Sequence, residues 1–287
     1  MTENAKIRRE MISIMEMYLE AMIEKKPDSL PLASTCRATY NGKTVTVGDN
    51  ELWANTLIIK QRQTFIDPVS GEMVFFGVMS NEPREMNEFF PIKVHVYKKE
   101  YLTTIRIKLI NYQIAEIEEL TIDDRLRYFY ADIKDVVLPD LEFEMIVPEE
   151  ERSTRDELIQ LVSDYWDCAA KWKPAEVLHI HPDAQRFENG YCTTNHSNSF
   201  RGDFKHNKSF RWDTPEASRC YPVVDPVRGL VVSSCYMLNG AGANRDGLMG
   251  ARIVEAFKIK DGAICRLLAF FPVMDCLTGW ETSDKTS

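Results

Sequence analysis

The chain repeats itself, and this internal repeat limits the fold more than any other feature of the sequence. Four segments occur in the same order in both halves: an opening helical pattern, a short extended piece ending in Asn-Gly, an Asp-Pro-Val-x-Gly turn, and a closing pair of strands. In the opening segment Arg8 aligns with Arg155 and Tyr18 with Tyr165. Because a repeat defines the structural unit, we predict two homologous domains in tandem. The alternative is one α+β domain whose similar strands only resemble a repeat.

Each repeat carries the pattern of a helix followed by a curved sheet. Apolar residues recur at helical spacing in residues 8–22 and again in residues 155–169. Thr154 and Glu157 have the spacing of a capping box at the start of the second helix. We therefore predict an α+β fold of two tandem cone-shaped barrels. In each, an N-terminal helix packs on a curved antiparallel sheet, with a pocket between helix and sheet.

Turn signals mark the ends of these elements. Lys25-Lys26-Pro27 places cations and then a helix breaker at the end of the first helix. Asp261-Gly262 predicts a hairpin between the closing strands of the second repeat. Asp67 and Asp225 occupy the same place in the two repeats, and both predict a β-turn in which the aspartate caps and the glycine takes a positive φ.

The chain has 287 residues, a comfortable length for two domains of about 140 residues each. An acidic stretch with two prolines separates the repeats, and we predict that it packs across the junction; a solvated connector is the alternative. The predicted division is a first domain at 1–120, a linker at 121–153, a second domain at 154–280 and a tail at 281–287.

Charge and cysteine content narrow the class of protein. The net charge of -9 argues against nucleic acid or an anionic membrane surface as a partner, because both attract clusters of Lys and Arg. No apolar run approaches the roughly 20 residues of a membrane helix, and the N-terminus lacks the pattern of a signal peptide. The 7 cysteines are scattered without a CxxC pair. We expect a reduced, cytoplasmic protein.

Several segments resemble the SnoaL-like branch of the nuclear transport factor 2-like superfamily, and in particular proteins with two such domains in tandem. The resemblance rests on the opening helices with Tyr18 or Tyr165 and on these stretches: LPLASTCRATYNG at 30–42, LW at 52–53, PDAQRFENG at 182–190, YPVVDPVRGLVV at 221–232, FKIKDGAICRL at 257–267, and Gly279-Trp280. It implies a cone-shaped α+β barrel in each half. By analogy it also implies dehydration, ketosteroid-type isomerisation, aldol cyclisation, epoxide opening or retro-aldol-type cleavage. Tyr40 stands where the second repeat has Glu188, so we expect that the two pockets are not equivalent and that one of them is only structural.

Motifs for common cofactors are missing from the sequence, which contains no GxGxxG, Walker A or HExxH pattern. We therefore expect no cofactor. His179-x-His181 is half of a metal site at most, because zinc needs a third ligand, and we predict no metal. The glycine-rich segment 237–250 suggests a lid over the pocket.

The second repeat holds most of the candidate site residues. Glu255 lies among apolar residues, and burial would raise its pKa and make it a usable general base if its side chain points inward; an exposed strand position is the alternative. Tyr221 and His181 complete the candidate catalytic group. The candidate substrate-binding residues are Arg186, Glu188, Asn189, Trp212 and Arg219, with Tyr40 and Trp53 in the first repeat. Arg186 and Glu188 share one strand face and form a candidate ion pair.

These residues predict a cofactor-independent acid–base enzyme, namely a lyase, dehydratase or isomerase, that acts on a small hydrophobic, oxygenated or aromatic molecule. In this interpretation Glu255 or a histidine removes a proton, and Tyr221, Asn189 and Arg219 stabilise the resulting oxyanion. The alternative is a non-catalytic module of the same fold that binds a small molecule or a protein. A homodimer through the sheets is a third arrangement that the fold allows.

Overall fold

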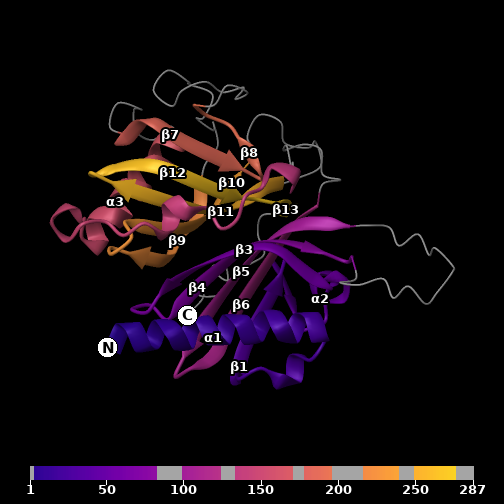
Figure 1. The fold of residues 1–287 in the computed structure, drawn as a ribbon. Helices are drawn as coiled ribbons and strands as arrows, with labels where there is room; N and C mark the ends of the chain where they lie inside the picture. The colour runs from indigo at the N-terminus through magenta and orange to yellow at the C-terminus, as the bar shows by residue number, and fades with distance from the viewer. Residues whose placement is uncertain are drawn as a thin grey trace, which may run out of the picture.

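The structure is a computed structural model that describes residues 3–82, 99–123, 133–170, 178–195, 216–238 and 249–275. It contains two mixed β-sheets, each accompanied by a long helix (Figure 1). The prediction of a two-unit α+β fold is therefore confirmed.

The first repeat starts with the long helix α1 (Glu3–Glu24), which ends just before Lys25, as predicted. The elements that follow are η1 (Pro27–Ser29), β1 (Leu32–Tyr40), β2 (Lys43–Val45), α2 (Glu51–Asn55), β3 (Ile58–Asp67), β4 (Glu72–Ser80), β5 (Glu100–Ile110) and β6 (Gln113–Asp123). Its sheet has the order β2-β1-β6-β5-β4-β3.

The second repeat starts with α3 (Arg155–Ala169), whose N-terminus has the predicted capping box of Thr154 and Glu157. Its strands are β7 (Ile180–Glu188), β8 (Tyr191–Cys192), β9 (Glu216–Asp225), β10 (Leu230–Leu238), β11 (Met249–Lys260), β12 (Ala263–Phe270) and β13 (Val273–Asp275). The sheet order β8-β7-β12-β11-β10-β9 repeats that of the first half, and β13 pairs with β11.

The prediction of wholly antiparallel sheets is wrong at one strand pair in each repeat. β1 runs parallel to β6, and β7 runs parallel to β12. The first long strand of each repeat lies beside the last, and the chain reaches that position through the intervening strands. The two ends of each sheet do not pair with each other, so both sheets stay open within the described residues.

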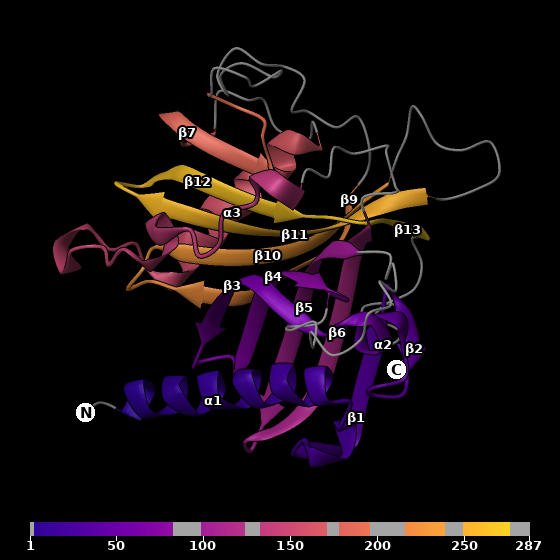
Figure 2. The ribbon, with the colours of Figure 1, turned by 45° about the vertical axis from the view of Figure 1, so that its right-hand side comes forward.

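The two sheets pack face to face, and each helix covers the outer face of its own sheet (Figures 1 and 2). Alternation along β4 shows the arrangement: Phe75 packs into the core beneath α1, whereas Phe76 packs between the sheets, where its ring lies 5.2 Å from that of Phe270. Because both faces are covered, β4 and β10 are almost continuously apolar. The order of layers is helix, sheet, sheet, helix.

Residues 133–153 contain η2 (Ile133–Asp135), η3 (Leu141–Glu144) and η4 (Glu149–Glu151), and Ile133 and Phe143 join the core between the two sheets. Phe143 is fully buried, with its ring 5.4 Å from that of Phe65 in the first repeat. The Asp140 backbone oxygen accepts a hydrogen bond from Gln63, and the Asp140 carboxylate accepts one from Arg266 at 2.7 Å. This segment thus ties the two repeats together.

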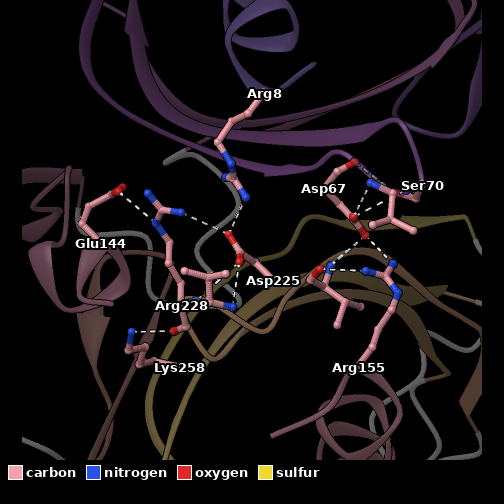
Figure 3. A network of polar contacts seen from close by, with 11 residues as sticks. Arg8, Asp67, Ser70, Glu144, Arg155, Asp225, Arg228 and Lys258 are labelled. Atoms are coloured by element: carbon pink, nitrogen blue, oxygen red, sulfur yellow. Dashed lines mark hydrogen bonds and ion pairs between the residues drawn. The ribbon is translucent and has the colours of Figure 1, made fainter. Parts of the chain in front are cut away.

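A reciprocal pair of ion contacts crosses the junction (Figure 3). Asp67 and Asp225 each cap their turn, as predicted, by accepting a backbone N–H bond at Oδ1, from Val69 at 2.9 Å and Val227 at 3.1 Å. The second oxygen of each aspartate reaches the other repeat: Arg155 donates to Asp67, and Arg8 donates to Asp225.

Because Arg8 and Arg155 align, and Asp67 and Asp225 align, the junction is isologous, as in a two-fold symmetric dimer. The two sheets therefore meet within a single chain in the way that two subunits meet in a homodimer.

No described helix is both long and apolar enough to cross a membrane.

Candidate functional site

In each repeat a buried glutamate lies beneath the tyrosine that the two helices carry at equivalent positions. In the first repeat this is Glu119 on β6, which is 1% exposed and accepts a hydrogen bond from Tyr18 at 2.8 Å. In the second repeat it is Glu255 on β11, which is 2% exposed and lies close enough to Tyr165 of α3 for the two groups to shift each other's pKa. The prediction left the direction of Glu255 open, and the structure places its side chain inside the protein.

The two glutamates occupy one location although they lie on different strands. In the sheet register Glu119 stands opposite Ile105, and Glu255 stands opposite Ala269. The sequence repeat aligns Ile105 with Glu255 and Glu119 with Ala269. The buried glutamate therefore lies on the last long strand in the first repeat and on the neighbouring strand in the second, and in both repeats it lies beneath the helix.

Three donors saturate the acid of the first repeat. Besides Tyr18, the Trp53 indole Nε1 donates to Glu119 at 2.9 Å and the Asn50 amide donates at 2.8 Å. Asn50 is also the N-cap of α2, where its Oδ1 accepts from the backbone N–H groups of Leu52 and Trp53 and so fixes the indole. Burial raises the pKa of Glu119 to about 7, against the opposing effect of these three donors.

A cavity of about 130 Å³ lies beside this cluster. Its lining residues are Tyr40, Asn41, Glu51, Leu52, Lys99, Tyr101 and Thr121. Tyr40, a predicted binding residue, lines this cavity, and its hydroxyl lies 3.0 Å from that of Thr121. Glu119 itself is not among the lining residues.

The acid of the second repeat stands in a charged cluster. The predicted ion pair exists: Arg186 Nη2 lies 3.4 Å from Glu188 Oε2, and Arg186 is 1% exposed. Arg186 also donates to the Tyr165 hydroxyl at 3.3 Å and to Thr193 Oγ1 at 3.1 Å. These bonds fix the guanidinium in place beneath α3.

Burial raises the pKa of Glu255 to about 8; the attraction of Arg186 and the interaction with Tyr165 lower it, and the negative charge of Glu188 raises it further. Within the described part of the chain, Oε1 of Glu255 makes no hydrogen bond. Burial also raises the pKa of Tyr165. The second repeat thus differs from the first: one oxygen of its buried acid is not occupied by a described donor.

Several predicted site residues lie elsewhere. His181 is exposed on β7, where its Nδ1 accepts a hydrogen bond from the Asp183 backbone, so it is not part of the cluster around Glu255. Arg219 on β9 donates to Ser163 at 2.7 Å and to Asp167 at 2.9 Å, both on α3. These contacts connect the strand to the helix. These two positions do not support the predicted catalytic and oxyanion roles.

Other predicted residues have partners that the sequence did not reveal. The side-chain amide of Asn189 donates a hydrogen bond to the Phe271 C=O and accepts one from the Phe271 N–H. It therefore connects two segments of the backbone and does not face a ligand. Tyr221 is half-buried against the core of the second repeat. Trp212 and most of the suggested lid at 237–250 lie outside the described residues.

The sequence analysis missed Glu119 and gave no role to either tyrosine. The signal was present in EIEEL at 116–120, since alternation places Glu119 on the same strand face as Ile117, which packs into the core beneath α1. Across the part of the chain that the structure covers, no three His, Cys, Asp or Glu residues are grouped to hold a metal ion.

Comparison with known proteins reaches only part of the chain. Residues 151–271 match a family described as "Domain of unknown function (DUF8021)". This match spans α3 and nearly all of the second sheet, which are the elements that surround Glu255. No curated protein matches the chain.

Proposed function

We propose that the second repeat is the site of a cofactor-independent acid–base enzyme, namely a lyase, dehydratase or isomerase, that acts on a small hydrophobic, oxygenated or aromatic molecule. The observation that carries this proposal is Glu255: a carboxyl group that is 2% exposed, has one oxygen without a described donor, and has a pKa raised to about 8. A base with a pKa near the working pH is suited to remove a proton from carbon.

The chemistry starts with one proton transfer. Glu255 takes a proton from the carbon next to a carbonyl group, and the electron pair of the broken C–H bond moves to the carbonyl oxygen. The resulting enolate then takes one of two routes. In a β,γ-unsaturated ketone, return of the proton from Glu255 to the γ-carbon gives isomerisation; in a β-hydroxyketone, the hydroxyl leaves with the proton from Glu255 as water, which gives dehydration. Carbon–carbon cleavage starts instead at the β-hydroxyl: Glu255 takes its proton, the O–H electron pair forms a new carbonyl as the Cα–Cβ bond breaks, and the enolate that results takes the proton back from Glu255.

Arg186 and Tyr165 are the donors best placed to stabilise the oxyanion, in place of the predicted Asn189 and Arg219. Arg186 and Tyr165 both lie close enough to Glu255 to lower the pKa of its carboxyl group, and Arg186 donates to the Tyr165 hydroxyl at 3.3 Å. A charged donor that is already fixed in a dry site stabilises developing charge without rearrangement. Glu188 compensates the charge of Arg186.

We also propose that each repeat is a SnoaL-like half-open cone, with its pocket between helix and sheet. The equal strand orders of the two sheets and the cores beneath α1 and α3 support this interpretation. In this proposal the first repeat is a structural copy, because both oxygens of Glu119 already accept hydrogen bonds from the repeat's own side chains.

The test is deuterium exchange with a panel of small hydrophobic ketones and β-hydroxyketones in D₂O, followed by proton NMR. We expect the wild type to exchange the α-hydrogens of at least one compound, and Glu255→Gln to be slower by about 10²–10⁴-fold. Glu119→Gln is the matched control and should retain the activity. Equal rates for wild type and Glu255→Gln would refute the role of Glu255. Saturable binding of a panel member without exchange would instead favour a non-catalytic binding module.

A further inference from the structure

A second cavity, of about 310 Å³, lies at the junction of the repeats. Its walls come from α1, from β3, from residues 139–144 and from the turn between β9 and β10. Neither repeat forms this cavity alone, and Glu255 is not among its lining residues. Figure 3 shows its charged side, where Arg8 and Arg228 contact Asp225 and Glu144 contacts Arg228.

The cavity has an apolar part and a charged rim. Ile12 and Met15 of α1, Phe65 of β3, Phe143 and Leu230 supply the apolar lining. Arg8, Arg62 and Arg228 supply guanidinium groups. Its volume lies at the lower end of the range of cavities that enclose small organic molecules, roughly 300–1,000 Å³.

The carboxylates of the rim are already paired with arginines. Asp225 Oδ2 accepts from Arg8 at 2.7 Å and from Arg228 at 3.2 Å. Glu144 lies 3.7 Å from Arg228 Nε, and Glu16 accepts from Arg62 at 2.5 Å. Each guanidinium carries five N–H donors, so the three arginines offer more donors than these carboxylates use. The rim therefore has spare charged donors for an acceptor that enters from solvent.

The sequence repeat provides a comparison for Arg228. At the equivalent place the first repeat has Ser70, which donates to the Pro222 backbone oxygen at 3.1 Å and carries no charge. The cationic group is thus present at only one of two equivalent turns, and it is the turn that lines the cavity. The turn itself does not need it, because Asp67 caps the other turn without it.

We propose that this junction cavity binds a small organic carboxylate, with the carboxylate at Arg228 and Arg8 and an apolar body against Ile12 and Phe143. Guanidinium groups bind carboxylates through two parallel hydrogen bonds, which gives both affinity and orientation. Because the ligand contacts both repeats, its binding also stabilises their docking. The site is separate from the one proposed around Glu255.

The experiment is isothermal titration calorimetry of the full chain at pH 7 with 4-phenylbutyrate, and with the neutral 4-phenylbutan-1-ol as the comparison ligand. We expect one saturable site for the acid, with a dissociation constant below about 1 mM, and binding of the alcohol at least about tenfold weaker. Arg228→Ser, which installs the residue of the first repeat, and Ile12→Glu, at an exposed position, should each weaken binding of the acid about tenfold or more.

Two controls separate this site from the rest of the molecule. Arg155→Ser removes the equivalent ion contact on the other side of the junction and should leave the affinity unchanged, as should Glu255→Gln. No saturable binding of the acid, equal affinity for acid and alcohol, or binding that resists both Arg228→Ser and Ile12→Glu would overturn the proposal. Binding that is lost only in Glu255→Gln would also overturn it and would place the carboxylate in the second repeat instead.

Discussion

The reciprocal contacts at the junction predict that Asp67→Asn destabilises the whole chain. Asp67 is fully buried, and its Oδ2 accepts from Arg155 and, at 3.2 Å, from the Val224 backbone N–H of the other repeat. Asparagine keeps an oxygen to cap the turn at Val69 but removes the charge and the acceptor that face the second repeat. The variant therefore isolates the junction contact from the turn.

The expected loss in free energy of unfolding is about 2–3 kcal/mol. Removing one partner of a fully buried ion pair costs about 3–5 kcal/mol, because the other charge is left without compensation. Arg155 is 31% exposed, so water solvates part of its stranded guanidinium and reduces this cost. The lost backbone bond from Val224 contributes about 1 kcal/mol of the total.

Urea denaturation at pH 7, followed by both far-UV circular dichroism and tryptophan fluorescence, measures this loss. Asp261→Asn is the matched control, since Asp261 lies in an exposed hairpin with a φ of 52° that asparagine also adopts. The control should stay within about 0.5 kcal/mol of the wild type. A double-mutant cycle of Asp67→Asn with Arg155→Gln should give a coupling of at least about 1 kcal/mol. A coupling near zero would refute the argument that the ion contact holds the repeats together.

Three further predictions concern the cores, caps and turns. Because the pKa values of Glu119 and Glu255 are raised to about 7 and 8, the folded state binds more protons than the unfolded state above pH 4.5. The free energy of unfolding should therefore fall as pH rises toward 8, by up to about 1.4 kcal/mol per pH unit for each group. In urea denaturation, Glu255→Gln should remove the part of this pH dependence that Glu255 causes. Thr154→Ala removes the capping box of α3 and should cost about 1 kcal/mol in the same assay. Gly229→Ala should lower the melting temperature far more than Gly262→Ala, although both glycines have a positive φ. A Cβ at position 229 would lie 2.2 Å from a backbone oxygen of β11, whereas a Cβ at position 262 would meet nothing within 4 Å.

Local signals in the sequence predicted the parts of the fold that depend on neighbouring residues. The capping box at Thr154, the end of α1 before Lys25 and the positive φ values at Asp261-Gly262 follow from residues a few positions apart. The internal repeat predicted that the same elements occur twice. The parallel pairing of β1 with β6 was not predicted, because the pairing of two strands far apart in the sequence leaves no pattern in either strand's own residues.

The candidate site was predicted less completely, for the same physical reason. Glu255 was selected from its apolar neighbours, and burial then gave the raised pKa that was expected. The partners of Trp53 and Arg219 depend on which helix or strand lies opposite, so only the fold reveals that one bonds Glu119 and the other bonds α3. The contacts of Asp67 across the junction were not predicted, because its role in capping the turn already accounted for an aspartate at this position.

The central claim is that Glu255 is a buried carboxyl group poised to exchange a proton near neutral pH. Carbon-13 NMR of the protein labelled at the glutamate side-chain carboxyl tests it most directly, with the Glu255 resonance assigned by its loss in Glu255→Gln. The account predicts that this resonance titrates with a midpoint near pH 8, well above the exposed glutamates. A midpoint between about 4 and 5 would show a solvated carboxylate and would contradict the proposed role of Glu255 as the base.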